Sequence, residues 1–189
     1  MLAGAGAARL FTKQPPVRFA DLSMANASTE QSRQRFKQAM QALATGVGDE
    51  RGPLVEALRD DPSFSEAALQ LAFLAGTEAP GSARDLTPWH QAQQRKATLT
   101  PRDQSLLDAL GPTFSDPPDW REAERRFSRL VEQWPGDAQL WGGLGSIRYL
   151  LGSDVGALDA FRAARQLDDA CTWGLSKDAR RLFLEGHRD

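Results

Sequence analysis

The sequence has few of the residues from which disulfide frameworks and zinc sites are built. Among its 189 residues are one cysteine, Cys171, and two histidines, His90 and His187. An intrachain disulfide is therefore ruled out, and so is a zinc site with four cysteine or histidine ligands. The net charge of −2 gives no overall basic field that would attract nucleic acid or an anionic membrane. We expect no metal, no other cofactor and no nucleic-acid partner.

Long hydrophobic runs are also missing. The N-terminal stretch "MLAGAGAARLF" is apolar, but it lacks the basic start of a signal peptide and the roughly 20 apolar residues of a membrane span. We therefore expect residues 1–27 to form a disordered N-terminal segment, and the chain to be cytoplasmic without direct membrane insertion. The alternative is that these residues are the end of a longer protein in which the chain follows a membrane span.

Signals that start and end α-helices recur along most of the chain. Each is a capping residue, a proline in the first turn, or a glycine or proline at the end, next to apolar residues at helical spacing. The clearest are Ser28 with Gln31, Pro53, Pro62, Ser63 with Glu66, Gly76, Thr100 with Pro101, and Asp119 with Glu122. Because no alternating apolar run is bounded by hairpin turns, strands are not expected and the fold class is all-α.

Most of the predicted loops are short, so consecutive helices are expected to be antiparallel neighbours. The exception is residues 76–88, where glycine and proline cluster, and the stretch 87–100 after it is mostly polar. We expect this part of the chain to be the most irregular. Near the other end, Ser176 and Gly186 bound a predicted final helix with apolar residues on its inner side.

A period of 34 residues relates the two best-patterned helix pairs. The pairs Ala123 and Ala157, Phe127 and Phe161, Leu110 and Leu144, and Gly111 and Gly145 are each 34 positions apart. Small residues such as Gly145 allow helix backbones to approach, and large ones such as Phe161 fill the space between helices. A single pair cannot bury its apolar face, so adjacent pairs are expected to stack.

This pattern resembles the tetratricopeptide repeat. Residues typical of the family are Trp141, Leu144, Gly145, Ala157, Phe161 and Ala164 in one unit, and Leu107, Leu110, Gly111, Phe114, Ala123, Phe127 and Pro135 in another. The sequence departs from the family at Asp169, where proline is preferred, and at Leu130, where alanine is preferred. The resemblance implies a short right-handed α-solenoid over residues 28–189, with units at about 28–64, 65–103, 104–137 and 138–171 and a capping helix at 172–189.

In the family's geometry, the first helix of each unit lines a concave groove that binds segments of other proteins. The residues at those positions here are Glu66, Leu69, Phe73, Ser105, Asp108, Gln139, Gly142, Ser146 and Tyr149. Members that bind chaperone tails carry lysine and asparagine there, and this chain has neither at these positions. The small, polar and partly apolar lining suits an extended segment or a helix of another protein.

Enzymatic chemistry has little support in the sequence. His90 has no placed partner, and Cys171 follows two aspartates that disfavour a reactive thiolate. The pairs at residues 60–61 and 168–169 are aspartates at predicted helix ends, and we interpret them as solvated turn residues. We therefore expect the protein not to be an enzyme.

The sequence thus predicts a non-catalytic module that binds another protein or a peptide segment. A looser resemblance of "LTPRDQSLLDAL" and "DPPDWREAERRF" to repeat regions of bacterial serine/threonine kinases and signalling regulators gives the alternative, a regulatory or sensory segment of a larger signalling protein. A third hypothesis, a small-molecule-binding helical domain, requires a closed apolar pocket. An exposed stripe of Arg121, Arg125 and Arg129 is interspersed with glutamates, which is typical of a solvated face and not of a binding site.

Overall fold

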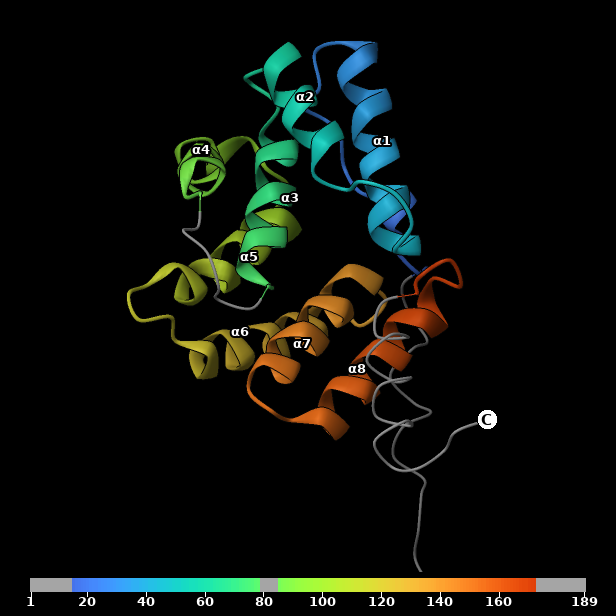
Figure 1. Ribbon diagram of the computed structural model, residues 1–189, viewed down its shortest axis with the longest axis vertical. Helices are drawn as coiled ribbons and strands as arrows, with labels where there is room; N and C mark the ends of the chain where they lie inside the picture. Colours follow the sequence, from blue (N-terminus) through green and yellow to red (C-terminus); the bar gives the residue numbers. More distant parts are fainter. Residues whose placement is uncertain (1–14, 79–84, 173–189) are drawn as a thin grey trace, which may run out of the picture.

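The computed structural model describes residues 15–78 and 85–172, and over these residues the protein is all-α (Figure 1). This part of the chain forms eight α-helices and three short 3-10 helices. The α-helices are α1 (Glu30–Thr45), α2 (Gly52–Asp60), α3 (Ser65–Gly76), α4 (Thr87–Gln94), α5 (Pro101–Leu110), α6 (Trp120–Gln133), α7 (Ala138–Leu150) and α8 (Asp154–Leu167). The 3-10 helices are η1 (Phe19–Asp21), η2 (Lys96–Thr98) and η3 (Gly111–Phe114).

Local sequence signals set several of these helix boundaries. Thr100 caps α5 and Asp119 caps α6, each with a side-chain oxygen that accepts a hydrogen bond from a backbone N–H of the first turn. Pro53 and Pro101 occupy the first turns of α2 and α5, where a missing N–H costs nothing. Helix α3 ends at Gly76. The sequence predictions are confirmed at all these positions.

Two predicted caps are wrong, because Asp61 binds the hydroxyl groups of both. Ser28 and Ser63 donate their hydroxyls to this carboxylate at 2.7 and 2.6 Å. Helix α1 is capped instead by the next residue, Thr29, and α3 has no side-chain cap. Glu66, the expected capping-box partner of Ser63, is buried and bonds to another part of the chain.

Most consecutive helices pack against one another, and the chain just after the last of the described helices returns to the first. In Figure 1 the helices run around the molecule from α1 through α3 and α5 to α8, whose end lies beside the end of α1. There the Thr172 backbone N–H donates to the Ala44 carbonyl at 2.8 Å, and the Thr172 hydroxyl donates to the Thr45 carbonyl. This contact ties the two ends of the helical array together.

Helix α3 lies at the centre of the array and is buried almost all round. All its residues except Ala75 are buried, because α2, α4 and α5 pack against it and α7 meets it from another side. The Phe73 ring lies against α7 at Gly143, and Gln139 of α7 donates to the Gln70 side chain. Apolar or small residues stand on every face of this helix, which is typical of burial on all sides.

Two glycines of α7 allow aromatic rings to press onto the helix backbone. A Cβ atom at Gly145 would lie 2.6 Å from the Phe161 ring of α8, and one at Gly143 would lie 2.6 Å from the Phe127 ring of α6. At Gly111 a Cβ would meet nothing nearer than 3.7 Å. The close packing expected from the 34-residue period is therefore present at Gly145 and absent at Gly111, where α5 has already ended.

Residues 15–27, which we expected to be disordered, are ordered and packed against the helices. Phe19, Leu22 and Ala27 are buried. The apolar residues of this stretch have neither helical nor alternating spacing, so tertiary contacts order it and local periodicity does not reveal it. Residues 1–14 lie outside the described residues, and so does the capping helix expected between Ser176 and Gly186.

The stretch expected to be the most irregular contains a helix. Residues 79–84 lie outside the described residues, but α4 begins soon after them, at Thr87. Trp89 of α4 stacks on Phe114 of η3, with ring centroids 4.5 Å apart. This aromatic contact between distant parts of the chain holds the polar helix in place.

Candidate functional site

The N-terminal segment, residues 15–28, crosses the edge of the array at which α3 and α7 begin. It makes hydrogen bonds there to five parts of the chain, which we call the segment-binding edge: Asp61, Glu66, Thr98, residues 136–138, and Asp168. The segment contains only the short η1 and is otherwise extended or in turns. The edge therefore holds an irregular stretch of polypeptide through contacts to helices that are far apart in the sequence.

At one end of the edge, the segment pairs with the start of α7 through its backbone. The Val17 N–H donates to the Gly136 carbonyl at 2.8 Å, and the Ala138 N–H donates to the Val17 carbonyl at 3.1 Å. These bonds form an isolated parallel bridge between Val17 and Asp137. One of the N–H groups that have no partner within α7 is satisfied in this way. Backbone pairing of this kind suits any extended segment.

Phe19 anchors the segment next to this bridge. Its side chain is buried in the core, and its backbone N–H donates to the Asp168 Oδ2 atom at 3.0 Å. The Asp168 Oδ1 atom accepts from the Ala170 N–H at 3.1 Å, so both carboxylate oxygens are used. We expected Asp168 to be a solvated turn residue, but it is only 4% exposed because the segment covers it.

Glu66 binds the middle of the segment with a single oxygen. Its Oε1 atom accepts hydrogen bonds from the Asn26 side chain at 3.0 Å, the Asn26 backbone N–H at 3.2 Å and the Ser23 hydroxyl at 3.4 Å. The Asn26 side chain also donates to the Thr98 carbonyl at 3.0 Å, so it joins α3 to η2. The Oε2 atom is buried and has no hydrogen-bond partner among the residues that the structure describes.

Burial raises the pKa of the Glu66 carboxyl. Loss of hydration is the largest cause, the hydrogen bonds from Asn26 and from the backbone oppose it, and the negative charge of Asp103 adds to the rise. A buried acceptor without a hydrogen bond has lost its bonds to water and formed none in the protein, which is unfavourable for folding. The edge therefore has an unsatisfied carboxylate oxygen directly beside the segment.

Asp61 holds the last residue of the segment. Its Oδ2 atom accepts from the Ser28 backbone N–H at 2.6 Å and from the Ser28 hydroxyl at 2.7 Å, and its Oδ1 atom accepts from Ser63. Burial acts to raise the pKa of Asp61, but the hydrogen bonds from Ser63 and Ser28 outweigh it and lower the pKa. A charged carboxylate thus fixes the segment immediately before α1 begins.

A buried guanidinium group stands behind the edge. Arg102 donates to both oxygens of Asp137 at 2.8 and 2.9 Å, to Asp103 at 2.8 Å and to Gln139 at 2.9 Å. Burial acts to lower the pKa of Arg102, but the charges and hydrogen bonds of Asp137 and Asp103 outweigh it and raise the pKa. Because Asp137 also caps α7, this ion pair fixes the helix start that pairs with Val17.

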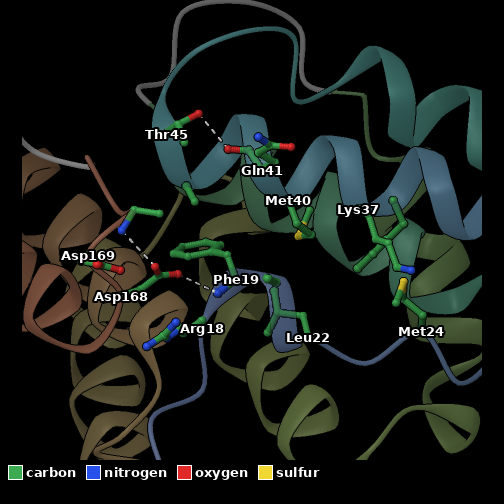
Figure 2. Close-up of a pocket in the computed structure, with 14 residues that line it drawn as sticks. Arg18, Phe19, Leu22, Met24, Lys37, Met40, Gln41, Thr45, Asp168 and Asp169 are labelled. Carbon is green, nitrogen blue, oxygen red and sulfur yellow. Dashed lines mark hydrogen bonds between the residues drawn. The ribbon is translucent and has the colours of Figure 1, made fainter.

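A pocket of about 370 Å³ lies between the segment and α1 (Figure 2). Figure 2 shows the side chains of Phe19, Leu22 and Met40 gathered around it, with Asp168 toward one end and Lys37 toward the other. The walls are thus mostly apolar, and charged groups stand at the ends. The segment covers this space without filling it.

Most of the residues that we expected to line an open groove lie in the interior. Glu66, Leu69, Phe73, Gln139, Gly142 and Ser146 are buried, whereas Ser105, Asp108 and Tyr149 are at least partly exposed. The buried set follows from the direct contact between α3 and α7, which leaves no open channel there. Glu66 belongs to the segment-binding edge, and Gln139 lies behind it, bonded to Arg102. A role in an accessible groove remains a prediction for Ser105, Asp108 and Tyr149.

The sequence analysis missed the edge, because its residues act through partners 33 to 149 positions away along the chain. Asn26 and Arg102 belong to no local pattern. One signal was present: Asp61 and Asp168 are the C-cap residues directly after α2 and α8. A negative charge is unfavourable at the C-terminal end of a helix, so an aspartate there indicates a partner elsewhere.

Comparisons of the chain with protein-family models, with curated proteins and with solved structures find no match. Within residues 15–78 and 85–172, no helix is both long and apolar enough to cross a membrane. In the same residues, no three histidine, cysteine, aspartate or glutamate side chains are grouped so that they could hold a metal ion. The segment-binding edge and the neighbouring pocket are therefore the features from which a function can be inferred.

Proposed function

We propose that the chain is a non-catalytic interaction module of the tetratricopeptide-repeat type that binds a segment of another protein. The observation that carries this proposal is the way in which the edge holds residues 15–28. It uses backbone pairing at Val17, a buried aromatic side chain at Phe19, and side-chain hydrogen bonds at Glu66 and Asp61. Backbone hydrogen bonds supply affinity and side-chain pockets supply specificity when proteins recognise extended peptides.

The order of the helices supports the repeat part of the proposal. The second helices of the last two pairs, α6 and α8, begin at Trp120 and Asp154, which keeps the 34-residue spacing. Phe161 packs onto Gly145, whereas Phe127, 34 positions earlier, packs onto Gly143 of α7 and not onto the equivalent Gly111. The first helices depart from the spacing because α5 begins early, at Pro101. The described array also differs from an open solenoid in that α8 returns to α1.

Selection of displayed random peptides on the full chain tests the proposal. We expect selected peptides to bind with a Kd of about 100 μM or tighter. Glu66→Gln keeps the shape of the side chain and removes its charge, so it should weaken binding. The exposed Glu132→Gln is the matched control and should leave binding unchanged.

A variant in which Arg121, Arg125 and Arg129 are changed to glutamate examines the exposed side of α6. Binding that responds to this variant and not to Glu66→Gln would contradict the proposal. Failure to select any binding peptide would contradict it as well. All variants are first compared by thermal unfolding, because a difference in binding is informative only between equally folded proteins.

The pocket favours a second candidate function, binding of a small apolar molecule with an anionic end. Its volume of about 370 Å³ and its apolar walls suit such a ligand, and Lys37 stands at the end away from Asp168 and Asp169, where the anionic group would lie. Octanoate is a suitable probe for titration calorimetry. Met40→Trp would fill the pocket and should abolish the heat of binding. If the wild-type chain gives no heat of binding, this candidate is refuted.

A further inference from the structure

We infer that residues 15–28 are an intramolecular occupant of the segment-binding edge, and that a partner segment with the same anchors replaces them. This inference rests on the proposed function and adds the chemistry of the partner and the regulation of the site. The anchors are an aromatic residue, an apolar residue three positions later, and an asparagine four positions after that, as in Phe19, Leu22 and Asn26.

The first argument is that the occupant leaves Glu66 incompletely satisfied. Three donors from the segment converge on its Oε1 atom, while its buried Oε2 atom has no hydrogen bond among the described residues. A segment with a basic side chain at the position of Ser23 would place a charged donor beside this carboxylate. Hydrogen bonds between charged groups are about twice as strong as neutral ones, so such a partner has an advantage over the chain's own segment.

The second argument is the unfilled pocket at the other anchor. Phe19 and Leu22 form one side of a space of about 370 Å³ whose other side belongs to α1. A space of this size admits water, and removing apolar surface from water is favourable. A partner with a larger apolar residue at the position of Leu22 would displace that water and gain affinity. The unpaired Oε2 atom of Glu66 and the unfilled pocket both lie between the segment and the rest of the chain. A partner that makes better contacts at these two places gains affinity over the segment.

The third argument is that the segment can leave without unwinding an α-helix. Its backbone is joined to the start of α7 by the two bonds of Val17, and its remaining anchors are side chains and single backbone N–H groups. Opening of the segment exposes the buried side chains of Phe19, Leu22 and Ala27 but breaks few backbone hydrogen bonds, so we expect it to cost less free energy than unfolding the core helices. While it is bound, the tethered segment competes at an effective concentration of about 1 mM, so it inhibits weak partners.

A labelled peptide with the sequence of residues 15–28, PPVRFADLSMANAS, is the probe for this exchange. It is titrated into the full chain carrying Phe19→Ala and Asn26→Ala, in which the tethered segment is weakened. Fluorescence anisotropy should show binding, and a peptide carrying Phe19→Ala should bind about 10-fold or more weakly. The wild-type chain should bind the probe more weakly than the double variant does. A peptide carrying Ser23→Lys should bind more tightly than the probe, and Glu66→Gln in the protein should remove this gain.

A folded double variant that does not bind the probe would overturn the inference, and so would one that binds the probe and the Phe19→Ala peptide equally. If circular dichroism shows that the double variant does not fold, hydrogen exchange of the wild-type chain decides the question. The Val17 and Phe19 amides should then exchange about 10-fold or more faster than the amides of α3. Equal protection would mean that the segment opens only with the whole fold, which refutes displacement. Selected library peptides whose binding is weakened by Glu66→Gln but that leave exchange of the segment unchanged would refute displacement while the proposed function stands.

Discussion

Gly145→Ala should destabilise the protein, although alanine is the better helix former. The added methyl carbon would lie 2.6, 2.7 and 3.0 Å from three atoms of the Phe161 ring, so the ring or α8 must shift. Overpacking of this kind costs about 1–3 kcal/mol, and the gain in helix propensity offsets about 1 kcal/mol of it. We expect a net loss of about 1 kcal/mol, which is a fall in Tm of about 2–4 °C for a chain of this size.

Gly111→Ala is the matched control, because Gly111 is related to Gly145 by the 34-residue period. A methyl carbon there would lie 3.7 Å from Arg126 and 3.9 Å from Trp89, which are ordinary contacts. We expect the stability to be unchanged or to rise by up to about 1 kcal/mol. Gly145→Ala should therefore lower the free energy of unfolding, whereas Gly111→Ala should leave it unchanged or raise it.

Urea unfolding followed by far-UV circular dichroism measures both variants. Phe161→Ala removes the obstructing ring, so in that background Gly145→Ala should lose its penalty and show only the gain in helix propensity. The coupling free energy between the two sites should be about 1–2 kcal/mol. Equal effects of Gly145→Ala in the presence and absence of the ring would refute the packing argument.

Four substitutions test the caps and the buried charges. Burial raises the pKa of Glu66 in the folded state above its ordinary value of 4.5, so its contribution to stability is present below that pH and is lost as the pH rises through the raised pKa. The gain in the free energy of unfolding from Glu66→Gln should therefore grow from about pH 4.5 toward neutral pH. Urea titrations at several pH values measure this gain, and a gain that does not change with pH would contradict the prediction. Thr29→Ala should cost about 1 kcal/mol in thermal unfolding, whereas Ser153→Ala should cost little because Ser153 accepts no capping hydrogen bond. Arg102→Met leaves the buried carboxylates of Asp137 and Asp103 without their cation. It should lower the free energy of unfolding by about 3–5 kcal/mol, and a loss below about 1 kcal/mol would contradict this expectation.

The positions of the helices could be predicted because their signals are local. Thr100 and Asp119 act on N–H groups within their own helices, so a few neighbouring residues contain all the information. The same reasoning was wrong at Ser28 and Ser63, whose hydroxyls both bind the Asp61 carboxylate, which is 33 positions from Ser28 but only two residues before Ser63. Local capping rules hold until a carboxylate comes near the capping hydroxyl, whether from the same turn or from elsewhere in the fold.

The groove residues show a different limit. The family resemblance placed Phe73 and Leu69 on an accessible face, whereas the apolar composition of α3 alone indicates burial on all sides. Beyond the two aspartates at helix ends, the sequence does not predict the segment-binding edge, because Phe19 and Asp168 meet only once every helix between them is in place. Single-sequence patterns contain no record of such a pairing.

The bond between Thr172 and Ala44 has a consequence for how the array loses structure. Linear repeat arrays fray from their terminal units, because each unit is supported only by its neighbours. Here the chain just after α8 bonds to the end of α1, and the N-terminal segment contacts both α1 and Asp168 at the end of α8. Melting of α8 would free Thr172 and Asp168 from these contacts, so the two ends of the described chain should lose structure together and not one after the other.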